Sequence, residues 1–506
     1  MSESFHPLEK YAAQTPAAIA LAAPGRRPLT YGELPDTLRA IRRAVTGAGF
    51  EPGEIAALVL PNGPDLIAAF LAVSAVGAGA PLNPAMTESE FRFYLGRLGA
   101  RTVILPDPMP AAALAAAQAL GIPVLRMRFT PGDTAGSFRL DAPQRATPAP
   151  PVRRTDAALL LFTSATTGSP KLVPLTWGNL RAMAAREAHT LQLSPADRLL
   201  SLMPLFHLHG LAAVLMQLFS GGTAIAIPGY HPATFLPWLQ QFQPTWFSSH
   251  APLNRAILAL ARAHPEVFRS SPLRVIRITG ATPEAAIPAA LEEAVGVPVL
   301  AGYGLTETGG VTRNTEAARK PGSVGRSSGL EVAIMDEAGN LLPAEAEGEV
   351  VVRGPSVTSG YLDDPEANLA AFRGGWFHTG DIGRLDGDDF LFLTGRLKEI
   401  INRGGEKIVP QDVECALLAH AAVAEAAVFA VYHRTLGEDV AAAVVLRPGA
   451  AASELKLRRF AAGRLAPFKV PRRIVFLDGI PRTATGKPQR AQLAERYRGG
   501  IPWPDR

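Results

Sequence analysis

A hydroxyl-rich segment follows directly on an apolar run. LFTSATTGSPKL (161–172) comes after the strand-like stretch 157–162 and carries hydroxyl side chains, a glycine and a lysine. Hydroxyls and backbone N–H groups suit the oxygens of a polyphosphate, while an ammonium group offsets its charge. The spacing is not GxxxxGK[ST], so the P-loop of nucleoside triphosphatases does not match, and a polar surface turn is the alternative for this segment alone. The polar candidates are Thr163, Ser164, Thr166, Thr167, Gly168 and Lys171.

A second segment, GYGLTETGG (302–310), combines an aromatic ring, glycines, a hydroxyl and a carboxylate. Tyr303 could stack on a purine, and Thr306 could donate a hydrogen bond to a phosphate. Glu307 could hold Mg²⁺, which prefers carboxylate and phosphate oxygens. A structural aromatic and a surface carboxylate are the plainer interpretation.

Two further segments supply charged groups. WFHTGD (376–381) ends in Asp381, whose two oxygens can accept both hydroxyls of a ribose, and Arg396 could add a second ribose contact. PRTATGK (481–487) presents Lys487 on a turn rich in Gly and Thr. Each segment alone has an ordinary structural explanation, but all four in this order indicate a nucleotide site.

The elements that would position these segments alternate between apolar strands and Ala/Leu-rich helices through about residue 320. Such alternation predicts doubly wound α/β units with parallel sheets. Residues 320–395 instead resemble paired antiparallel strands, so a small β-rich module is predicted there. A change of texture after Gly395 predicts two domains, 1–395 and 396–506, with the boundary at 395–398. The strand-like runs are IAALVLP (55–61), RTVILP (101–106), ALLLF (158–162), TAIAIP (223–228) and LRVIRITG (273–280).

Composition narrows the possible partners. With 506 residues, 47% of them hydrophobic, the chain is too long for one core. From Arg396 onward 19 basic residues face 11 acidic ones, which suits a phosphorylated small molecule or simply a solvated basic surface. No nucleic-acid-binding signature is present.

Other features of the sequence bear on its compartment. One cysteine, Cys415, excludes an intrachain disulfide, and the polar start shows no signal-peptide pattern. The apolar run 66–82 is short and rich in Ala and Gly, so a packed helix is expected rather than a membrane span. We expect a cytoplasmic protein, either a monomer or a homodimer.

Six motifs in this order resemble the adenylate-forming enzymes: acyl-CoA synthetases, luciferases and the adenylation domains of peptide synthetases. They are TSATTGSPK, PLFHLHG, GYGLTE, WFHTGD, GRLKEIINRGGEK and PRTATGK, and the likeness runs from TYGEL (30–34) onward. KPGSVGR, GPSVTSGYLDDPEAN and INRGGEKI are most similar to acyl-CoA synthetases, including the oxalate-CoA ligase branch. The resemblance implies a large N-terminal domain of two doubly wound sheets and a small β-barrel module, followed by a mobile α+β C-terminal domain.

The resemblance also implies a reaction in two steps. ATP and a carboxylic acid would form an acyl-adenylate and pyrophosphate, and the thiol of CoA would then displace AMP. Lys487 would bridge the two anions of the first step, with Thr306 and Glu307 beside it and Mg²⁺ on Glu307. The implied ATP- and AMP-binding residues are Thr163, Ser164, Thr166, Thr167, Gly168, Lys171, Gly280, Ala281, Thr282, Tyr303, Thr306, Asp381 and Arg396.

For the second step, the resemblance implies rotation of the small domain about Lys398. The rotation would withdraw Lys487 and bring Gly404 and Gly405 to a narrow tunnel for the pantetheine arm of CoA, where a Cβ would obstruct the thiol. A tight turn is the structural explanation for the same pair of glycines, and the two can hold together.

The acyl pocket is predicted near residues 206–211, 246–252, 278–282 and 302–312. Its candidates are His207, His250, Gly302, Gly309 and Gly310, the glycines leaving space for an aliphatic or aromatic acyl chain, while His209 is expected merely to pack. Oxalate-specific relatives carry serine and histidine where this chain has Gly280 and Gly310. A medium-sized monocarboxylate is therefore favoured, and a small dicarboxylate held by Arg313 is the alternative.

Two other functions remain as alternatives, and a third is disfavoured. A ligase that loads a carrier protein has similar motifs, and a non-catalytic relative could bind a nucleotide or acyl ligand. A NAD(P)-dependent oxidoreductase lacks support, because no GxGxxG follows the first strands. Two positions depart from the family's loop: Ala165 and Leu172 stand where glycine is common, which predicts a stiffer loop.

Overall fold

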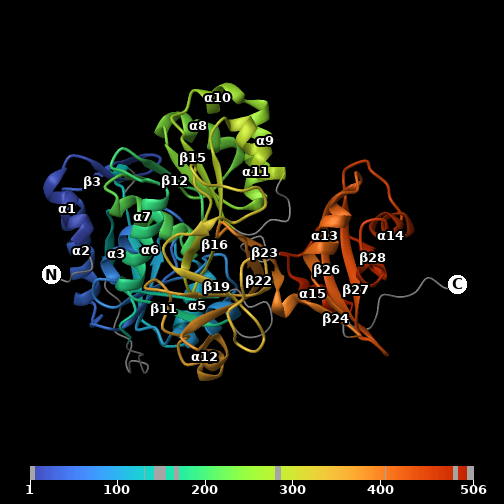
Figure 1. The fold of residues 1–506 in the computed structure, drawn as a ribbon. Coiled ribbons are helices and arrows are strands. Elements are labelled where there is room, and N and C mark those ends of the chain that lie inside the picture. The colour runs from blue at the N-terminus through green and yellow to red at the C-terminus, as the bar shows by residue number, and fades with distance from the viewer. Residues whose placement is uncertain are drawn as a thin grey trace.

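A computed structural model describes residues 6–129, 132–141, 155–163, 170–279, 286–404, 406–482 and 488–497. Their helices and strands form two large sheets flanked by helices, a small β module and a C-terminal α+β domain, which lies to one side of the rest (Figure 1). The predicted α/β class is confirmed.

The first large sheet has seven strands in the order β11-β10-β5-β4-β6-β7-β9. Its five inner strands run parallel, and β11 and β9 add to the two edges in antiparallel orientation. Strands β4 and β5 are buried along their whole length, as expected for strands covered on both faces. The strands are β4 Ile55–Leu58, β5 Ala78–Pro81, β6 Thr102–Pro106, β7 Val124–Arg128, β9 Arg139–Asp141, β10 Leu159–Phe162 and β11 Leu172–Leu175.

The second large sheet has nine strands in the order β18-β17-β16-β15-β14-β12-β13-β1-β3. The six strands from β16 to β1 are parallel, so the segments that follow them meet at one edge of the sheet. The strands are β1 Ile19–Ala22, β3 Leu29–Thr30, β12 Arg198–Ser201, β13 Thr223–Ala226, β14 Trp246–Ser249, β15 Val275–Thr279, β16 Val299–Leu305, β17 Gly309–Arg313 and β18 Arg326–Ser327. A separate short pair joins β2 Arg26–Arg27 to β8 Gly132–Thr134.

Helices cover both large sheets. Helix α4 begins with a capping box, in which the side chains of Thr87 and Glu90 each accept a backbone N–H of the other residue. Helix α6 begins with a similar reciprocal pair, Thr176 and Asn179. The helices are α1 His6–Gln14, α2 Leu34–Gly47, α3 Pro64–Val73, α4 Glu88–Leu98, α5 Ala111–Ala119, α6 Trp177–Thr190, α7 Leu208–Phe219, α8 Pro232–Phe242, α9 Ala251–Ala263, α10 Pro265–Arg269 and α11 Ala286–Val295.

The β module is a five-stranded antiparallel sheet, with helix α12 Pro365–Ala371 beside it. Within the described residues no ladder joins β19 to β23, so this sheet is open where the sequence suggested a barrel. Strand β23 carries the chain directly to the predicted domain boundary. The strands are β19 Glu331–Met335, β20 Gly348–Arg353, β21 Phe372–Arg373, β22 Trp376–Leu385 and β23 Leu391–Arg396.

The C-terminal domain has a core of its own, in which strands β26 and β27 pair along their whole length. The predicted helices and strands of this domain are present. They are β24 Ile401–Arg403, β25 Glu406–Ile408, α13 Pro410–Leu418, β26 Val423–His433, β27 Gly437–Leu446, α14 Glu454–Ala462, β28 Arg473–Phe476 and α15 Arg490–Arg496, with 3₁₀ turns η2 Leu397–Glu399 and η3 Pro467–Lys469.

The apolar run 66–82 was predicted as one packed helix, and that prediction is only half right. Helix α3 ends at Val73, and the run continues into the buried strand β5. None of the described helices has the length and apolar character that crossing a bilayer requires.

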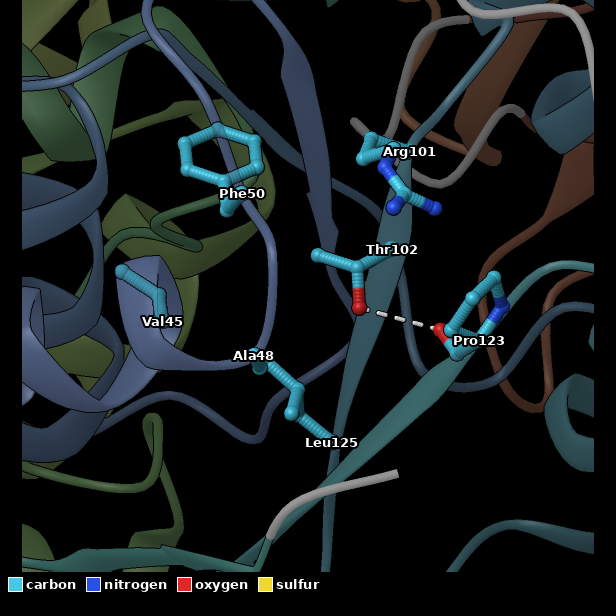
Figure 2. A pocket seen from close by; sticks show the side chains of 7 residues that line it. All are labelled: Val45, Ala48, Phe50, Arg101, Thr102, Pro123 and Leu125. Atoms are coloured by element: carbon cyan, nitrogen blue, oxygen red, sulfur yellow. Dashed lines mark hydrogen bonds between the residues drawn. The ribbon is translucent and has the colours of Figure 1, made fainter. Parts of the chain in front are cut away.

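A small hollow lies among the N-terminal elements (Figure 2). Its lining is mostly apolar and includes Val45, Phe50 and Leu125. The Thr102 hydroxyl on its wall donates to the Pro123 carbonyl at 3.0 Å, so this polar group is already satisfied. None of the candidate site residues lines the hollow.

Candidate active site

A buried carboxylate links the β module to the second large sheet. Tyr303, on β16, donates its hydroxyl to Asp381 Oδ2 at 2.5 Å, and Arg396 Nε lies 2.6 Å from Asp381 Oδ1. Asp381 and Arg396 are direct partners in the β22–β23 ladder, which explains their proximity. The structure thus brings together three residues that the sequence assigned to the nucleotide.

The simplest expectation was that both carboxylate oxygens of Asp381 would be available for the hydroxyls of a ribose, and the structure differs from it. Both oxygens of Asp381 already accept a hydrogen bond or ion pair, and the residue is 3% exposed. Tyr303 is 5% exposed, and burial followed by the neighbouring Asp381 raises its pKa well above the ordinary value. Stacking of this ring on a purine stays a prediction.

A second carboxylate, Glu307, lies in the turn between β16 and β17. It is 8% exposed, and its Oε1 accepts the Tyr361 hydroxyl at 2.9 Å. The ammonium of Lys171 lies 4.3 Å from the centre of the Tyr361 ring, so two predicted phosphate-site residues converge around this tyrosine. Thr306 is half-buried in the same turn.

Glu307 has the properties expected of a magnesium ligand. Within the described residues no ion pair joins its carboxylate, and burial raises its pKa despite the nearby charges of Lys171 and Arg396. A buried carboxylate without a compensating cation at contact distance favours a divalent cation with oxygen ligands.

The ends of the hydroxyl-rich loop are held together by a hairpin. Thr163 donates its backbone N–H to the Lys171 carbonyl at 2.9 Å, and the Lys171 N–H donates to the Thr163 hydroxyl at 3.2 Å. Leu172 begins β11 opposite Phe162 and is 1% exposed, so a core position explains this departure from glycine. Several predicted residues lie outside the described ranges: Ser164, Ala165, Thr166, Thr167, Gly168, Gly280, Ala281, Thr282, Gly405 and Lys487.

The three glycines expected to leave room for an acyl chain do not do so. A Cβ on Gly302 would come within 2.6 Å of Arg313 Nη1. A Cβ on Gly309 would meet Met183, and one on Gly310 would meet the carboxylate of Glu187. The space beside these glycines is occupied by side chains of this chain, so that premise of the predicted pocket is wrong.

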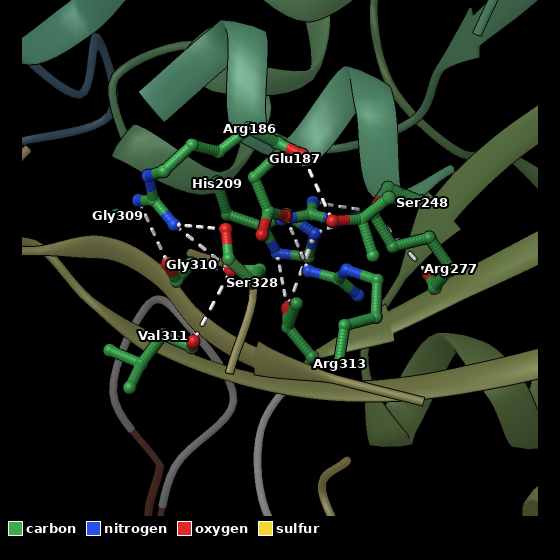
Figure 3. A network of polar contacts seen from close by, with 12 residues as sticks. Arg186, Glu187, His209, Ser248, Arg277, Gly309, Gly310, Val311, Arg313 and Ser328 are labelled. Carbon is green, nitrogen blue, oxygen red and sulfur yellow. Dashed lines mark hydrogen bonds and ion pairs between the residues drawn. The ribbon is translucent and has the colours of Figure 1, made fainter. Parts of the chain in front are cut away.

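The occupying side chains include a buried ionic cluster (Figure 3). Glu187, on α6, accepts Arg313 Nη2 at 2.6 Å and Arg277 Nη2 at 3.1 Å, both through its Oε2. The side chains of Glu187, Arg277 and Arg313 are 1%, 4% and 0% exposed. Burial alone would raise the pKa of Glu187, but the Arg313 and Arg277 guanidiniums lower it to about 2.

Polar side chains extend this cluster toward helix α7. His209 lies 2.6 Å from the Ser248 hydroxyl through Nε2 and 2.8 Å from the Thr279 hydroxyl through Nδ1. Arg277 Nη1 donates to the same Ser248 hydroxyl at 3.0 Å. Burial, then the Arg277 and Arg313 charges, hold the pKa of His209 well below its usual value, so its ring is neutral.

The other two histidines mark helix starts. His207 is the N-cap residue of α7, and its ring centre lies 4.7 Å from that of Phe206. His250 caps α9, its Nδ1 accepting the Leu253 N–H at 3.4 Å. The capping role explains His250 without an acyl ligand, and its place in the pocket stays a prediction.

The predicted hinge and tunnel residues lie close in sequence at the start of the C-terminal domain. Lys398 falls in the 3₁₀ turn η2. Gly404 has φ +62° in the turn between β24 and β25, and its N–H donates to the Leu436 carbonyl at 2.9 Å. The tight-turn explanation for this glycine therefore holds.

Sequence analysis missed four residues of this site. Tyr361 lies within GPSVTSGYLDDPEAN, which was used only for resemblance. His209 was expected merely to pack, and Glu187 and Arg277 stand in segments that predict ordinary helix and strand. A charge inside the apolar strand IRI (276–278) was the one available signal.

Comparisons with known proteins agree with this architecture. The AMP-binding enzyme family matches residues 8–362, and the AMP-binding enzyme C-terminal domain matches residues 412–487. The chain is 38% identical to an oxalate–CoA ligase of Arabidopsis thaliana, over 97% of this chain and 98% of the relative. It is 35% identical to a 2-succinylbenzoate–CoA ligase of Geobacillus kaustophilus, over 96% of each.

Among solved structures, an O-succinylbenzoate coenzyme A synthetase from Bacillus subtilis in complex with ATP and magnesium ion is similar. It shares 28% identity and a TM-score of 0.82, over 96% of this chain and 98% of that one. The chain therefore belongs to the AMP-binding enzyme family. It is an AMP-forming acid–thiol ligase.

Proposed function

We propose that the residues gathered between β16, β22 and β23 bind the ATP of an acid–CoA ligase. Asp381 and Arg396 contact the ribose, and Tyr303 and the segment 280–282 contact the base. Lys171 and the hydroxyls of 163–168 hold the β- and γ-phosphates, and Thr306 contacts the α-phosphate. The supporting observation is that Lys171, Glu307 and the cross-strand pair of Asp381 and Arg396 converge from three distant parts of the chain.

The first step requires two anions to approach each other. Lys487 offsets the charge shared by the acid carboxylate and the α-phosphate as the carboxylate oxygen attacks and pyrophosphate leaves. Glu307 would hold Mg²⁺, which supplies positive charge to the triphosphate when bound. His207, at the start of α7, borders the carboxylate.

The second step replaces the mixed anhydride between the acyl group and the phosphate of AMP with a thioester. The CoA sulfur attacks the acyl carbon, and AMP leaves with the electron pair of the broken bond. We propose that the C-terminal domain turns about Lys398 between the steps, withdrawing Lys487 and placing Gly404 and Gly405 along the pantetheine arm. The basic excess beyond Arg396 favours the phosphates of CoA.

The proposal also concerns the acid that is activated, the thiol that accepts the acyl group and the cellular location of the protein. The two relatives carry names for oxalate and for 2-succinylbenzoate, acids of different size, so they do not select an acid for this chain. We propose CoA rather than a carrier protein as the acceptor, and a cytoplasmic location.

Separate assays of adenylation and of thioester formation test the proposal. Acids graded in length, aromaticity and charge would be screened for pyrophosphate exchange and for CoA-dependent AMP release. With the best acid, Lys487→Ala should lose about 100-fold or more in adenylation and only a few-fold in thioester formation from the purified acyl-adenylate. The exposed Lys456→Ala on α14 is the matched control and should retain both. Full exchange activity in Lys487→Ala would refute the role of Lys487.

A further inference from the structure

Strand β22 bulges out of its ladder at Asp381. Where β20 pairs with β22, the single residue Val350 lies opposite the three residues 379–381. A bulge of this kind leaves backbone groups without their usual ladder partners and redirects the side chains that it carries. Gly380, in the middle of the bulge, has φ +70°, a conformation that favours glycine. The bulge therefore sets the direction of the carboxylate that we assign to the ribose.

Side chains supply hydrogen-bond partners to the backbone of this bulge. Gly380 donates its N–H to Glu349 Oε1 at 3.0 Å, and Asp381 donates its N–H to the Thr379 hydroxyl oxygen at 3.0 Å. The Thr379 hydroxyl donates in turn to the Val350 carbonyl at 2.7 Å. Backbone N–H groups that are shielded from water need such partners. The shape of the bulge is thus held from β20, by one carboxylate and one carbonyl.

The carboxylate of Glu349 is itself held in place. Its Oε2 lies 2.7 Å from His378 Nδ1 and 3.9 Å from the guanidinium of Arg373. Since an ionised carboxylate only accepts hydrogen bonds, Nδ1 of His378 carries the proton. The side chains of Glu349 and His378 are 14% and 8% exposed, so little water competes for these bonds. With both oxygens engaged, Glu349 presents a fixed acceptor to the bulge.

The carboxylate of Asp381 must be aimed accurately to bind a ribose. Its Oδ2 accepts the Tyr303 hydroxyl, and its Oδ1 pairs with Arg396 Nε. A carboxylate has about four acceptor positions, so about two remain for the hydroxyls of a ribose. A displacement on the order of 1 Å is enough to lose hydrogen bonds of this kind.

We propose that Glu349 is a positioning residue for ATP: by accepting the Gly380 N–H, it fixes the bulge that aims Asp381 at the ribose hydroxyls. This inference rests on the proposed function, in which Asp381 contacts the ribose. Glu349 acts through Asp381 and does not touch the nucleotide. Because successive residues of a strand point to opposite faces, a change of register by one residue would turn the Asp381 side chain away from Tyr303.

A purely structural pair of Glu349 and His378 is the alternative explanation. Loss of such a pair would lower the free energy of unfolding, but the folded enzyme would distinguish nucleotides as before. Loss of a positioning residue would also change how the folded enzyme recognises the ribose. The two explanations therefore differ in the discrimination between nucleotides with and without ribose hydroxyls.

Nucleotide binding to the full-length protein separates the two explanations. Calorimetric titrations with ATP and with 2′,3′-dideoxy-ATP, both with Mg²⁺, require no acid, and the two nucleotides differ only in the ribose hydroxyls. We expect the wild type to bind ATP more tightly by about 10-fold or more, and Glu349→Ala to bind the two nucleotides within about 3-fold of each other. The ratio of the two Kd values describes folded protein only, so a loss of folded enzyme does not change it.

Two further variants serve as controls. Glu349→Gln keeps an oxygen that can accept the Gly380 N–H, so it should keep most of the preference for ATP. Glu331→Ala removes another carboxylate of the β module, which pairs with Arg353 at 2.6 Å on the neighbouring strand, and it should keep the preference in full.

The outcomes distinguish this inference from the proposed function. A wild-type preference for ATP in Glu349→Ala, or equal losses in Glu349→Ala and Glu349→Gln, would overturn the inference and leave the ligase function intact. A wild type that binds both nucleotides equally would overturn the ribose contact of Asp381, and the inference with it. A wild type that binds neither nucleotide would overturn the proposed function itself.

Discussion

Replacing Glu187 with glutamine tests whether the cluster is held together by charge. The substitution keeps the shape of the side chain but leaves Arg277 and Arg313 buried without an anion. At an effective dielectric constant of about 20 and a charge separation of about 4 Å, each attraction is worth about 4 kcal/mol. Repulsion between the two arginines offsets part of this sum. We therefore expect Glu187→Gln to lower the free energy of unfolding by about 3–5 kcal/mol at pH 7.

The pKa of Glu187 provides a separate route to the same magnitude. It falls from 4.5 to about 2 on folding, which corresponds to stabilisation on the order of 3 kcal/mol. Because the folded-state pKa is the lower one, this stabilisation is present above about pH 4.5 and is lost as the pH falls toward 2. The stability deficit of Glu187→Gln should therefore shrink steadily across that window and disappear only below about pH 2.

Urea unfolding followed by tryptophan fluorescence measures the effect, because Trp177 on α6 and Trp246 on β14 report on this part of the chain. The control is Glu331→Gln, which removes an exposed ion pair with Arg353 of 2.6 Å. Exposed pairs contribute little, so this control should lose no more than about 0.5 kcal/mol. An equal loss in both variants, or a Glu187→Gln deficit that is as large at pH 3 as at pH 7, would refute the reasoning.

Two further substitutions address the nucleotide side. Tyr303→Phe removes the hydroxyl that donates to buried Asp381 and should cost about 2 kcal/mol in the same unfolding assay; a loss below about 0.5 kcal/mol would contradict the geometry. Glu307→Gln should weaken the apparent Mg²⁺ affinity by about 10- to 100-fold in magnesium titrations of pyrophosphate exchange, whereas unchanged affinity would place the metal elsewhere.

The convergence of Lys171, Glu307, Asp381 and Arg396 could largely be predicted from sequence because these residues stand in short motifs at strand ends. Glycines, prolines and alternating apolar runs marked most of the strands, and the carboxyl edge of a parallel sheet then gathered the following segments. The pairing of Asp381 with Arg396 required one step more, since it depends on the register of two antiparallel strands. Tyr361 escaped notice because its partner, Glu307, lies far away in sequence.

The buried ionic cluster could not be predicted in this way. Glu187 occurs within AAREAHT, a stretch that is typical of an ordinary helix, and nothing local shows that this carboxylate is 1% exposed. Its partners stand on two different strands, so the ionic cluster exists only after α6 has packed across β15 and β17. The glycines were interpreted alone, without the side chains that fill the space beside them.

At this cluster, each glycine leaves the space that a charged side chain from another element fills. Arg313 can lie flat against β16 because residue 302 has no Cβ, and Glu187 can reach both arginines because residue 310 has none. An alanine at either position would displace a buried charge from its partners, which costs more than the added methyl group could return. The geometry of the ionic cluster is therefore carried by matched pairs, a glycine on one element and a charged side chain on another. Altering it requires changes on both elements together, because a single substitution leaves either a clash or an unpaired ion.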